Sequence, residues 1–212
     1  MNPDESQSVE LLRRAAAGDP EAVNELFSLY RDRLRVMVRL RLNRRLQGRV
    51  DPSDVLQEAY LEICKHFADY ARAPTLPFFL WLRHITGQKL IAAHRQHLGA
   101  QMRDADREVS LYRGALPEAS SASLAAQLLG RFTSVSQAAM RAELQIRVQE
   151  ALNSMDPLDR EVLALRHFEI LSNAETAAVL GIKKSAASNR YIRALERLKE
   201  MLAGLPDFAE LD

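Results

Sequence analysis

Apolar residues recur every three or four positions along most of the chain, which is the spacing of one face of an α-helix. The longest such stripe, between residues 20 and 46, consists of Val23, Leu26, Phe27, Tyr30, Leu34, Met37 and Val38. Further stripes occupy residues 52–70 and 78–97, whereas alternating β-branched runs, which mark strands, are almost absent. The pattern predicts an all-α protein.

Helix starts are marked by three Asp-Pro pairs and one capping box. Residues 19–20, 51–52 and 156–157 each place Asp at the N-cap and Pro at the first helical position, where its missing N–H is not needed. Ser172 and Glu175 have the spacing of a capping box. The predicted helices cover residues 9–17, 20–46, 52–70, 78–97, 135–153, 157–168, 173–180 and 184–202.

The helical pattern fades after residue 97, where Gly114, Pro117 and a Ser-rich stretch mark a linker. We therefore expect two small helical domains, residues 1–97 and 140–212. They are joined by a linker over residues 98–139, which contains a helical segment near residues 124–131.

Charge is segregated along the chain although the net charge of the 212 residues is only +1. Residues 31–49 hold eight arginines and one acid, and residues 51–70 hold five acids and one lysine. Residues 181–200 hold six basic residues and two acids. The overall charge does not indicate nucleic-acid binding, so that inference depends on the basic segments alone.

Composition and motifs argue against several other classes of protein. The lone Cys64 is expected to be buried and cannot form an internal disulfide. Residues 1–18 do not resemble a signal peptide and no stretch has the length of a membrane span, so we expect a cytoplasmic protein. The five histidines match no catalytic triad or metal pattern and no Gly-rich phosphate loop is present, so we predict no enzyme, catalytic residue, metal or cofactor.

Residues 173–202 have the pattern of a helix-turn-helix. Ala177 and Gly181 allow a close crossing, and Gly181 can adopt the positive φ that ends a helix. The apolar face of the second helix is expected to comprise Ala187, Tyr191, Leu195, Leu198 and Leu202. The opposite face carries Lys184, Ser188, Asn189, Arg193 and Arg197, and these residue types suit the major groove and phosphates. The pattern favours DNA binding over an ordinary amphipathic hairpin.

An acidic row lies on the predicted helix 52–70. Asp54, Glu58 and Glu62 are spaced four apart, so they repel one another unless a basic partner faces them. Gln57 and Leu61 share this face and favour a protein interface. A metal site is disfavoured because side chains spaced four apart along a single helix rarely close a coordination shell.

Several segments together resemble the extracytoplasmic-function group of sigma factors, subunits of bacterial RNA polymerase. The similar stretches are DPSDVLQEAYLEI at 51–63, FFLWLRHI at 78–85, MDPLDREVLALR at 155–166 and the helix-turn-helix through RALERL at 193–198. The resemblance implies a first domain that binds core polymerase and the minus-ten element. It implies a second domain that binds the minus-thirty-five element.

The resemblance also assigns residues to partners. Core polymerase would be contacted at its β′ clamp by Asp54, Gln57, Glu58 and Leu61, and also at its β flap. The minus-thirty-five element would be read by Lys184, Ser185, Ser188, Asn189, Arg190, Ile192, Arg193 and Arg197. The minus-ten strand would meet the loop 71–77 and the helix after it, on which His84, Gln88 and Arg95 share a face. An anti-sigma factor or another regulator is a further partner that this resemblance admits.

The chain departs from the family at three places. Gly87-Gln88 stands where Arg-Asn is frequent, Ser188 stands where Lys or Arg is common, and the linker is long for the group. Trp81 lies in an apolar stripe, so we expect it in the core rather than as a stacking platform. The alternatives are a helix-turn-helix regulator that is not a polymerase subunit, an enzyme, or a helical adaptor.

Overall fold

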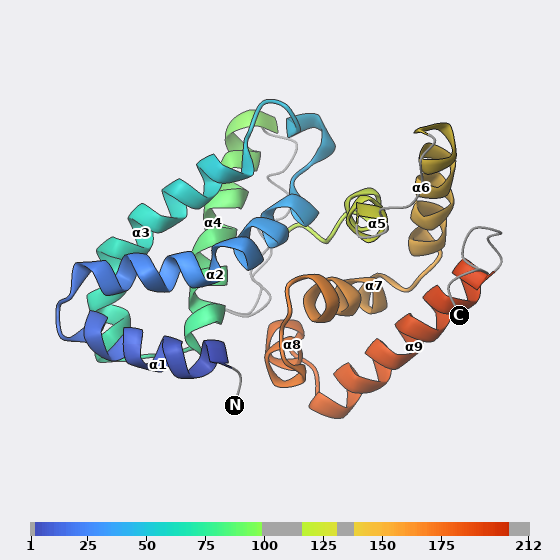
Figure 1. The fold of residues 1–212 in the computed structure, drawn as a ribbon. Coiled ribbons are helices and arrows are strands. Elements are labelled where there is room, and N and C mark those ends of the chain that lie inside the picture. The colour runs from blue at the N-terminus through green and yellow to red at the C-terminus, as the bar shows by residue number, and fades with distance from the viewer. Residues whose placement is uncertain (1–2, 99–115, 131–137, 204–212) are drawn as a thin grey trace. The chain divides into compact units, whose positions relative to one another are not determined.

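The structure is a computed structural model in which residues 3–98, 116–130 and 138–203 are described. These residues are helical without strands, as the periodicity predicts, and none of their helices has the length and hydropathy needed to cross a membrane. They fall into two compact units, one of residues 3–98 with Leu116 and the other of residues 117–203 (Figure 1).

The first unit consists of four α-helices and one short 3₁₀ turn. Helix α2 packs against α1 and α3, and α4 packs against both α3 and α2 (Figure 1). Asp19 and Asp51 accept hydrogen bonds from backbone N–H groups of the first turns of α2 and α3, which confirms the two predicted N-caps. The elements are α1 (Pro3–Ala16), α2 (Pro20–Arg41), η1 (Arg44–Leu46), α3 (Pro52–Arg72) and α4 (Phe78–Leu98).

Helix α2 ends at Arg41, five residues before its predicted end at residue 46. Leu42 is extended, and Asn43 caps η1 by accepting from the N–H of Arg45. The buried His94 of α4 accepts from the N–H of Asn43 through Nε2 at 3.3 Å. The prediction is wrong here because a contact between helices replaces the hydrogen bond that would continue α2.

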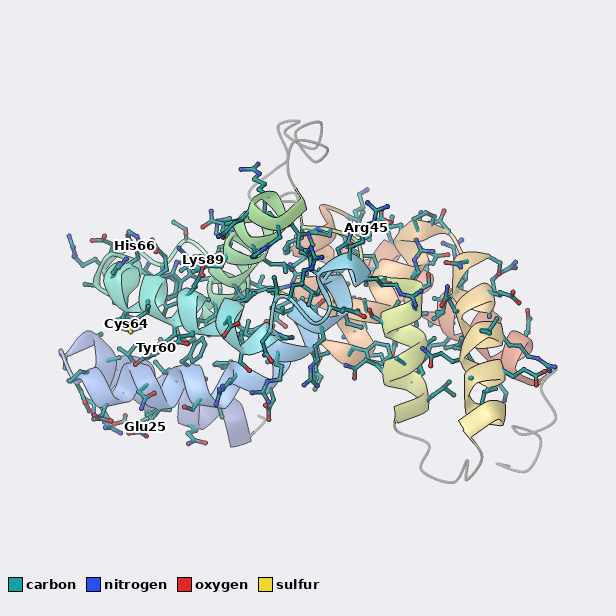
Figure 2. All side chains as sticks on the ribbon, turned by 90° about the horizontal axis from the view of Figure 1, so that it is seen from above. Glu25, Arg45, Tyr60, Cys64, His66 and Lys89 are labelled. Carbon is teal, nitrogen blue, oxygen red and sulfur yellow. The ribbon has the colours of Figure 1, made fainter. Side chains whose placement is uncertain are left out.

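The core of the first unit confirms most of the predicted apolar stripes. Leu26, Leu34, Met37 and Ile63 are almost completely buried. Cys64 is exposed, so the prediction that it is buried is wrong. It follows Ile63, the buried residue of that turn, and therefore lies off the core face near Tyr60 (Figure 2).

The second unit contains the rest of the described helices. Asp156 caps α7 as predicted, and α7 continues directly into a π-helical turn, η3. Residues 117–130, which the sequence pattern assigns to the linker, pack within this unit, with α5 against α6. The elements are α5 (Ser121–Gly130), α6 (Ala138–Asn153), α7 (Pro157–Leu163), η3 (Ala164–Phe168), α8 (Asn173–Leu180) and α9 (Lys184–Ala203). The predicted start of a helix at residue 135 lies outside the described residues.

The core face of α9 is shifted slightly from the prediction. Ala187, Ala194 and Leu198 are buried, whereas Leu195 is 38% exposed. Leu195 lies at the edge of the stripe because the buried positions follow spacings of seven and four, which keep one face of a helix. It lines an apolar cavity of about 220 Å³ together with Leu198 and residues of α5, α6 and α7. The predicted core residue 202 lies outside the described side chains.

Candidate functional site

The start of α8 is fixed by a reciprocal pair of hydrogen bonds. The Oγ of Ser172 accepts from the N–H of Glu175 at 3.2 Å, and the carboxylate of Glu175 accepts from the N–H of Ser172 at 2.8 Å. This is the predicted capping box. It satisfies two donors that would otherwise lack partners at the helix start.

The turn between α8 and α9 is held by its backbone. Gly181 has φ +63°, as predicted for a helix-ending glycine, and its N–H donates to the carbonyl of Ala178 at 3.2 Å. The N–H of Ile182 donates to the carbonyl of Ala177 at 3.0 Å, which completes a Schellman motif. The amide of Asn173 donates to the carbonyl of Lys184 at 2.9 Å. The start of α9 is therefore tied to the start of α8.

The outer face of α9 brings the predicted DNA-binding residues together. Ser188 and Arg190 are half-buried, and the remaining residues of this group are exposed. Ile192 is 52% exposed, which leaves it accessible to a base methyl group. The exposed residues are Lys184, Ser185, Asn189, Ile192, Arg193 and Arg197.

Sequence reasoning missed an acidic partner of this helix. The Nη1 of Arg190 lies 2.6 Å from an oxygen of Asp159 and 3.4 Å from an oxygen of Asp156. The Nη2 of Arg193 lies 3.9 Å from the same oxygen of Asp159. The recurrence of Asp three residues after the N-cap of α7 is a weak signal in the sequence, but spacing alone does not show what it faces.

The acidic row on α3 divides into exposed and paired members. Asp54, Gln57 and Glu58 are exposed, and Leu61 is 55% exposed. Glu62 differs because it accepts from Lys89 of α4 at 2.9 Å and from His66 at 3.0 Å.

The contacts of Glu62 give it a structural role. The hydrogen bond from Lys89, followed by that from His66, lowers the pKa of the Glu62 carboxyl below its usual value. Glu62 therefore joins α3 to α4, and the four residues assigned to core polymerase form the exposed part of the row.

Helix α4 presents His84 and Gln88 side by side. The amide of Gln88 donates to Nε2 of His84 at 3.1 Å. Burial, and to a smaller extent Arg83, lowers the pKa of His84 below its usual value, which favours the neutral ring. Arg95 is exposed two turns after Gln88, so the three predicted residues follow one side of the helix.

Trp81 belongs to an aromatic cluster at the end of α3 and the start of α4. Its ring stacks on Tyr70 with centroids 4.4 Å apart and meets Phe67 and Phe78 at longer distances. The hydroxyl of Tyr70 donates to the carbonyl of Leu76 at 2.9 Å, which anchors the loop 71–77. Trp81 is half-buried, so it lies at the edge of the core and not fully within it.

Gly87 gives a physical reason for one departure from the family pattern. A Cβ at this position would lie 2.7 Å from the Cδ2 of Leu116. The absence of a side chain therefore lets Leu116 pack directly on α4. A residue with a side chain would have to displace it.

A comparison with protein families matches the chain from residue 5 to residue 203 to the family described as ECF sigma factor. The chain belongs to the ECF sigma factor family. The resemblance stated from the sequence is thereby confirmed, and this family member is a sigma factor with a role in transcription initiation. The family is not one of enzymes.

The compared relatives match this ECF sigma factor either over most of its length or over about a quarter of it. The ECF RNA polymerase sigma factor SigD of Mycobacterium tuberculosis is 29% identical over 94% of this chain and 85% of its own length. RNA polymerase sigma-E factor of Streptomyces coelicolor is 40% identical over 26% of this chain and 31% of its own length. The solved structure of CnrH in complex with the cytosolic domain of CnrY covers 94% of this chain and 99% of the CnrH chain, with a TM-score of 0.54 and 22% identity. That likeness supports the helical fold.

Proposed function

We propose that this sigma factor binds core RNA polymerase, recognises a promoter at two separated elements and directs initiation there. The observation that carries the proposal is the α8–α9 helix-turn-helix, whose second helix exposes a row of basic and polar side chains. Such a helix fits the major groove of duplex DNA. The four exposed polymerase-binding candidates on α3 lie in the other unit, so each unit has its own proposed partner.

The minus-thirty-five element is assigned to α9. Asn189 and Arg193 can make bidentate contacts with adenine and guanine, and Ile192 can contact a thymine methyl group. Ser188 lies on the same face and can donate to either type of base edge.

The remaining polar residues of α9 suit the DNA backbone. Lys184 and Ser185 lie in the first turn of α9, where free backbone N–H groups also attract phosphate. Arg197 lies one turn after Arg193 and extends the basic face. Arg190 differs from the other residues of the set because its guanidinium already pairs with Asp159.

The minus-ten element is assigned to the first unit. His84, Gln88 and Arg95 follow one side of α4, and the loop 71–77 precedes that helix. Because the ring of His84 is mainly neutral, it can accept a hydrogen bond from a base or donate one to it without adding charge. Arg95 supplies the positive charge that attracts the DNA backbone.

Core polymerase is assigned to the exposed part of the row on α3. Asp54 and Glu58 are like charges one turn apart, and such a pair is destabilising in an isolated helix. A basic surface on the β′ clamp would attract both carboxylates and so offset their mutual repulsion. Gln57 and Leu61 would add a hydrogen-bonding group and an apolar contact, and the β flap is proposed as the contact of the second unit.

Control by a protein partner is also proposed. CnrH has been solved bound to the cytosolic domain of CnrY. We propose by analogy that an anti-sigma factor or a comparable regulator holds this chain away from polymerase or DNA.

The proposal is tested by transcription with purified core polymerase on a library of randomised promoters, with the start sites sequenced. The Asp54→Lys, Glu58→Lys double variant should lose co-purification with core polymerase while keeping its helical circular dichroism. The Glu21→Lys, Asp32→Lys variant makes the same charge change at exposed positions of α2 and is the matched control. Transcription that does not depend on added chain, or unchanged co-purification of the double variant, would contradict the proposal. Sequence-specific DNA binding without polymerase would favour a separate helix-turn-helix regulator.

A further inference from the structure

Two arginines of α9 share one carboxylate of α7. Arg190 pairs with Asp159 at 2.6 Å, while the contact of Arg193 with the same oxygen is longer, at 3.9 Å. The side chain of Arg190 is 27% exposed and that of Arg193 is 61% exposed. The two arginines are therefore in different environments although both lie in the basic segment 181–200.

Arg190 contacts two acidic residues at the start of α7. Asp156 is the N-cap and accepts from the N–H groups of Leu158 and Asp159 at 2.8 and 3.4 Å. Asp159 stands three residues later, in the first turn, where the helix dipole favours negative charge. The side chain of Asp159 is 18% exposed and that of Asp156 is 55% exposed, and each places a carboxylate oxygen within 3.4 Å of the Nη1 of Arg190.

We infer that Arg190 is a positioning residue that clamps α9 to α7, and that Asp159 aims the neighbouring Arg193 at the DNA. This inference rests on the proposed reading of promoter DNA by α9. It removes Arg190 from the residues that touch DNA and adds Asp159 to those that determine specificity. Asp159 also withholds one positive charge from the phosphates, which limits binding to DNA of any sequence.

The contacts of Arg190 lead to different expectations for its Lys and Gln variants. Both contacts of Arg190 are made by one nitrogen, Nη1, so a single cationic head group is enough for the clamp. Arg190→Lys should therefore retain most of the function and Arg190→Gln should lose it. Asp159→Asn should release Arg193 and leave Arg190 only its longer contact with Asp156, so that DNA of any sequence binds more tightly and discrimination between sequences falls.

The first test needs no DNA. The unfolding free energy of the full chain is measured in urea for the wild type, Arg190→Gln, Asp159→Asn and the double variant. If the two side chains act as a pair, the loss in the double variant is smaller than the sum of the two single losses. Arg190→Lys should stay close to the wild type. Additive losses, or an Arg190→Lys variant as weak as Arg190→Gln, would overturn the clamp.

The second test measures binding of the reconstituted holoenzyme to a pool of duplex DNA with a randomised upstream promoter region, at several salt concentrations. A residue that contacts one phosphate contributes about one unit to the slope of log affinity against log salt. Arg190→Gln should lower affinity without changing this slope, whereas Asp159→Asn should steepen it and flatten the sequence preference. Lys199→Gln, at an exposed position of the same helix, is the control for loss of charge alone.

Arg193→Gln is the positive control for a base contact. Its affinity for the preferred sequences should fall by about 5- to 150-fold, as expected for loss of a bidentate contact.

A slope of log affinity against log salt that falls by about one in Arg190→Gln would identify a phosphate contact and overturn the positioning role. If the wild-type holoenzyme shows no sequence preference in the pool, the proposed function fails. The unfolding measurements without DNA then test the contact between Arg190 and Asp159 independently.

Discussion

Ile170 adopts a backbone conformation that a β-branched residue rarely takes. It has φ +56° in the connection between η3 and α8, and no other non-glycine residue in the described part of the chain has a positive φ. Its side chain is 62% exposed, so little burial compensates for the strain. We predict that the Ile170→Gly variant is more stable than the Ile170→Ala variant.

The comparison of these two variants isolates the backbone. Both remove the isoleucine side chain, so they lose nearly the same contacts. The left-handed region costs an L-residue about 1–2 kcal/mol, and this cost falls on Ala but not on Gly. Gly in turn loses about 0.4–1 kcal/mol more conformational entropy on folding. The difference leaves Gly ahead by about 0.5–1 kcal/mol, which is opposite to the order in a helix interior.

Urea unfolding followed by far-ultraviolet circular dichroism measures the difference. With a dependence of about 1–3 kcal/mol per molar urea, the two midpoints should differ by a few tenths of a molar. The fluorescence of Trp81, the single tryptophan of the chain, reports the first unit and should not change. Gly and Ala placed at the exposed helical position Glu196 are the matched control, and there Ala should be more stable by about 1 kcal/mol. An Ala variant at residue 170 as stable as the Gly variant would refute the strain argument.

Three further predictions concern the first unit. Gly87→Ala should raise the unfolding free energy by about 1 kcal/mol in a Leu116→Ala background but by less in the wild type, because the new Cβ meets Leu116; urea unfolding followed by tryptophan fluorescence measures both. Lys89→Met should raise the pKa of Glu62. Glu62 contributes stability that is fully present above its usual pKa of 4.5 and is lost as the pH falls through its lowered pKa. In the Lys89→Met variant this loss should be complete at a higher pH, and unfolding measured across the acid range tests this shift. Burial lowers the pKa of His94 below 6.5, so its protonation destabilises the fold as the pH falls below that value. His94→Gln should therefore lose less stability than the wild type between about pH 7.5 and about pH 5.5, and equal losses would contradict the assignment.

The starts of α2, α3, α7 and α8 could be predicted from sequence because each depends on chemistry within four residues. Helix α1, which has no such signal, begins at Pro3, six residues before its predicted start at residue 9. An Asp at the N-cap followed by Pro satisfies the first free donors and fits the first turn without any distant contact. The same holds for the capping box at Ser172 and for the positive φ of Gly181. These features were therefore predicted at the correct residues.

The errors occur where a distant residue competes with the local pattern. The end of α2 depends on His94, which is 51 residues from Asn43 in sequence, and no local signal marks that contact. Cys64 follows a buried residue in an apolar run, so its exposure depends on the exact rotation of α3 against its neighbours. Leu195 is displaced from the core for the same reason on α9.

Charge patterns show this limit most clearly at the candidate sites. Glu58 and Glu62 belong to one acidic row, yet Glu62 is bound to Lys89 and Glu58 is exposed. Arg190 and Arg193 belong to one basic segment, residues 181–200, yet Arg190 is bound closely by Asp159. The spacing of charged residues along a helix predicts the side on which each charge lies. Whether a residue of another helix neutralises that charge depends on the tertiary fold. An exposed and unneutralised charge keeps its long-range field and can steer and bind a partner, whereas a paired one mainly fixes the geometry of the helix that carries it. In both rows the fold therefore separates the charges suited to binding from those that position them.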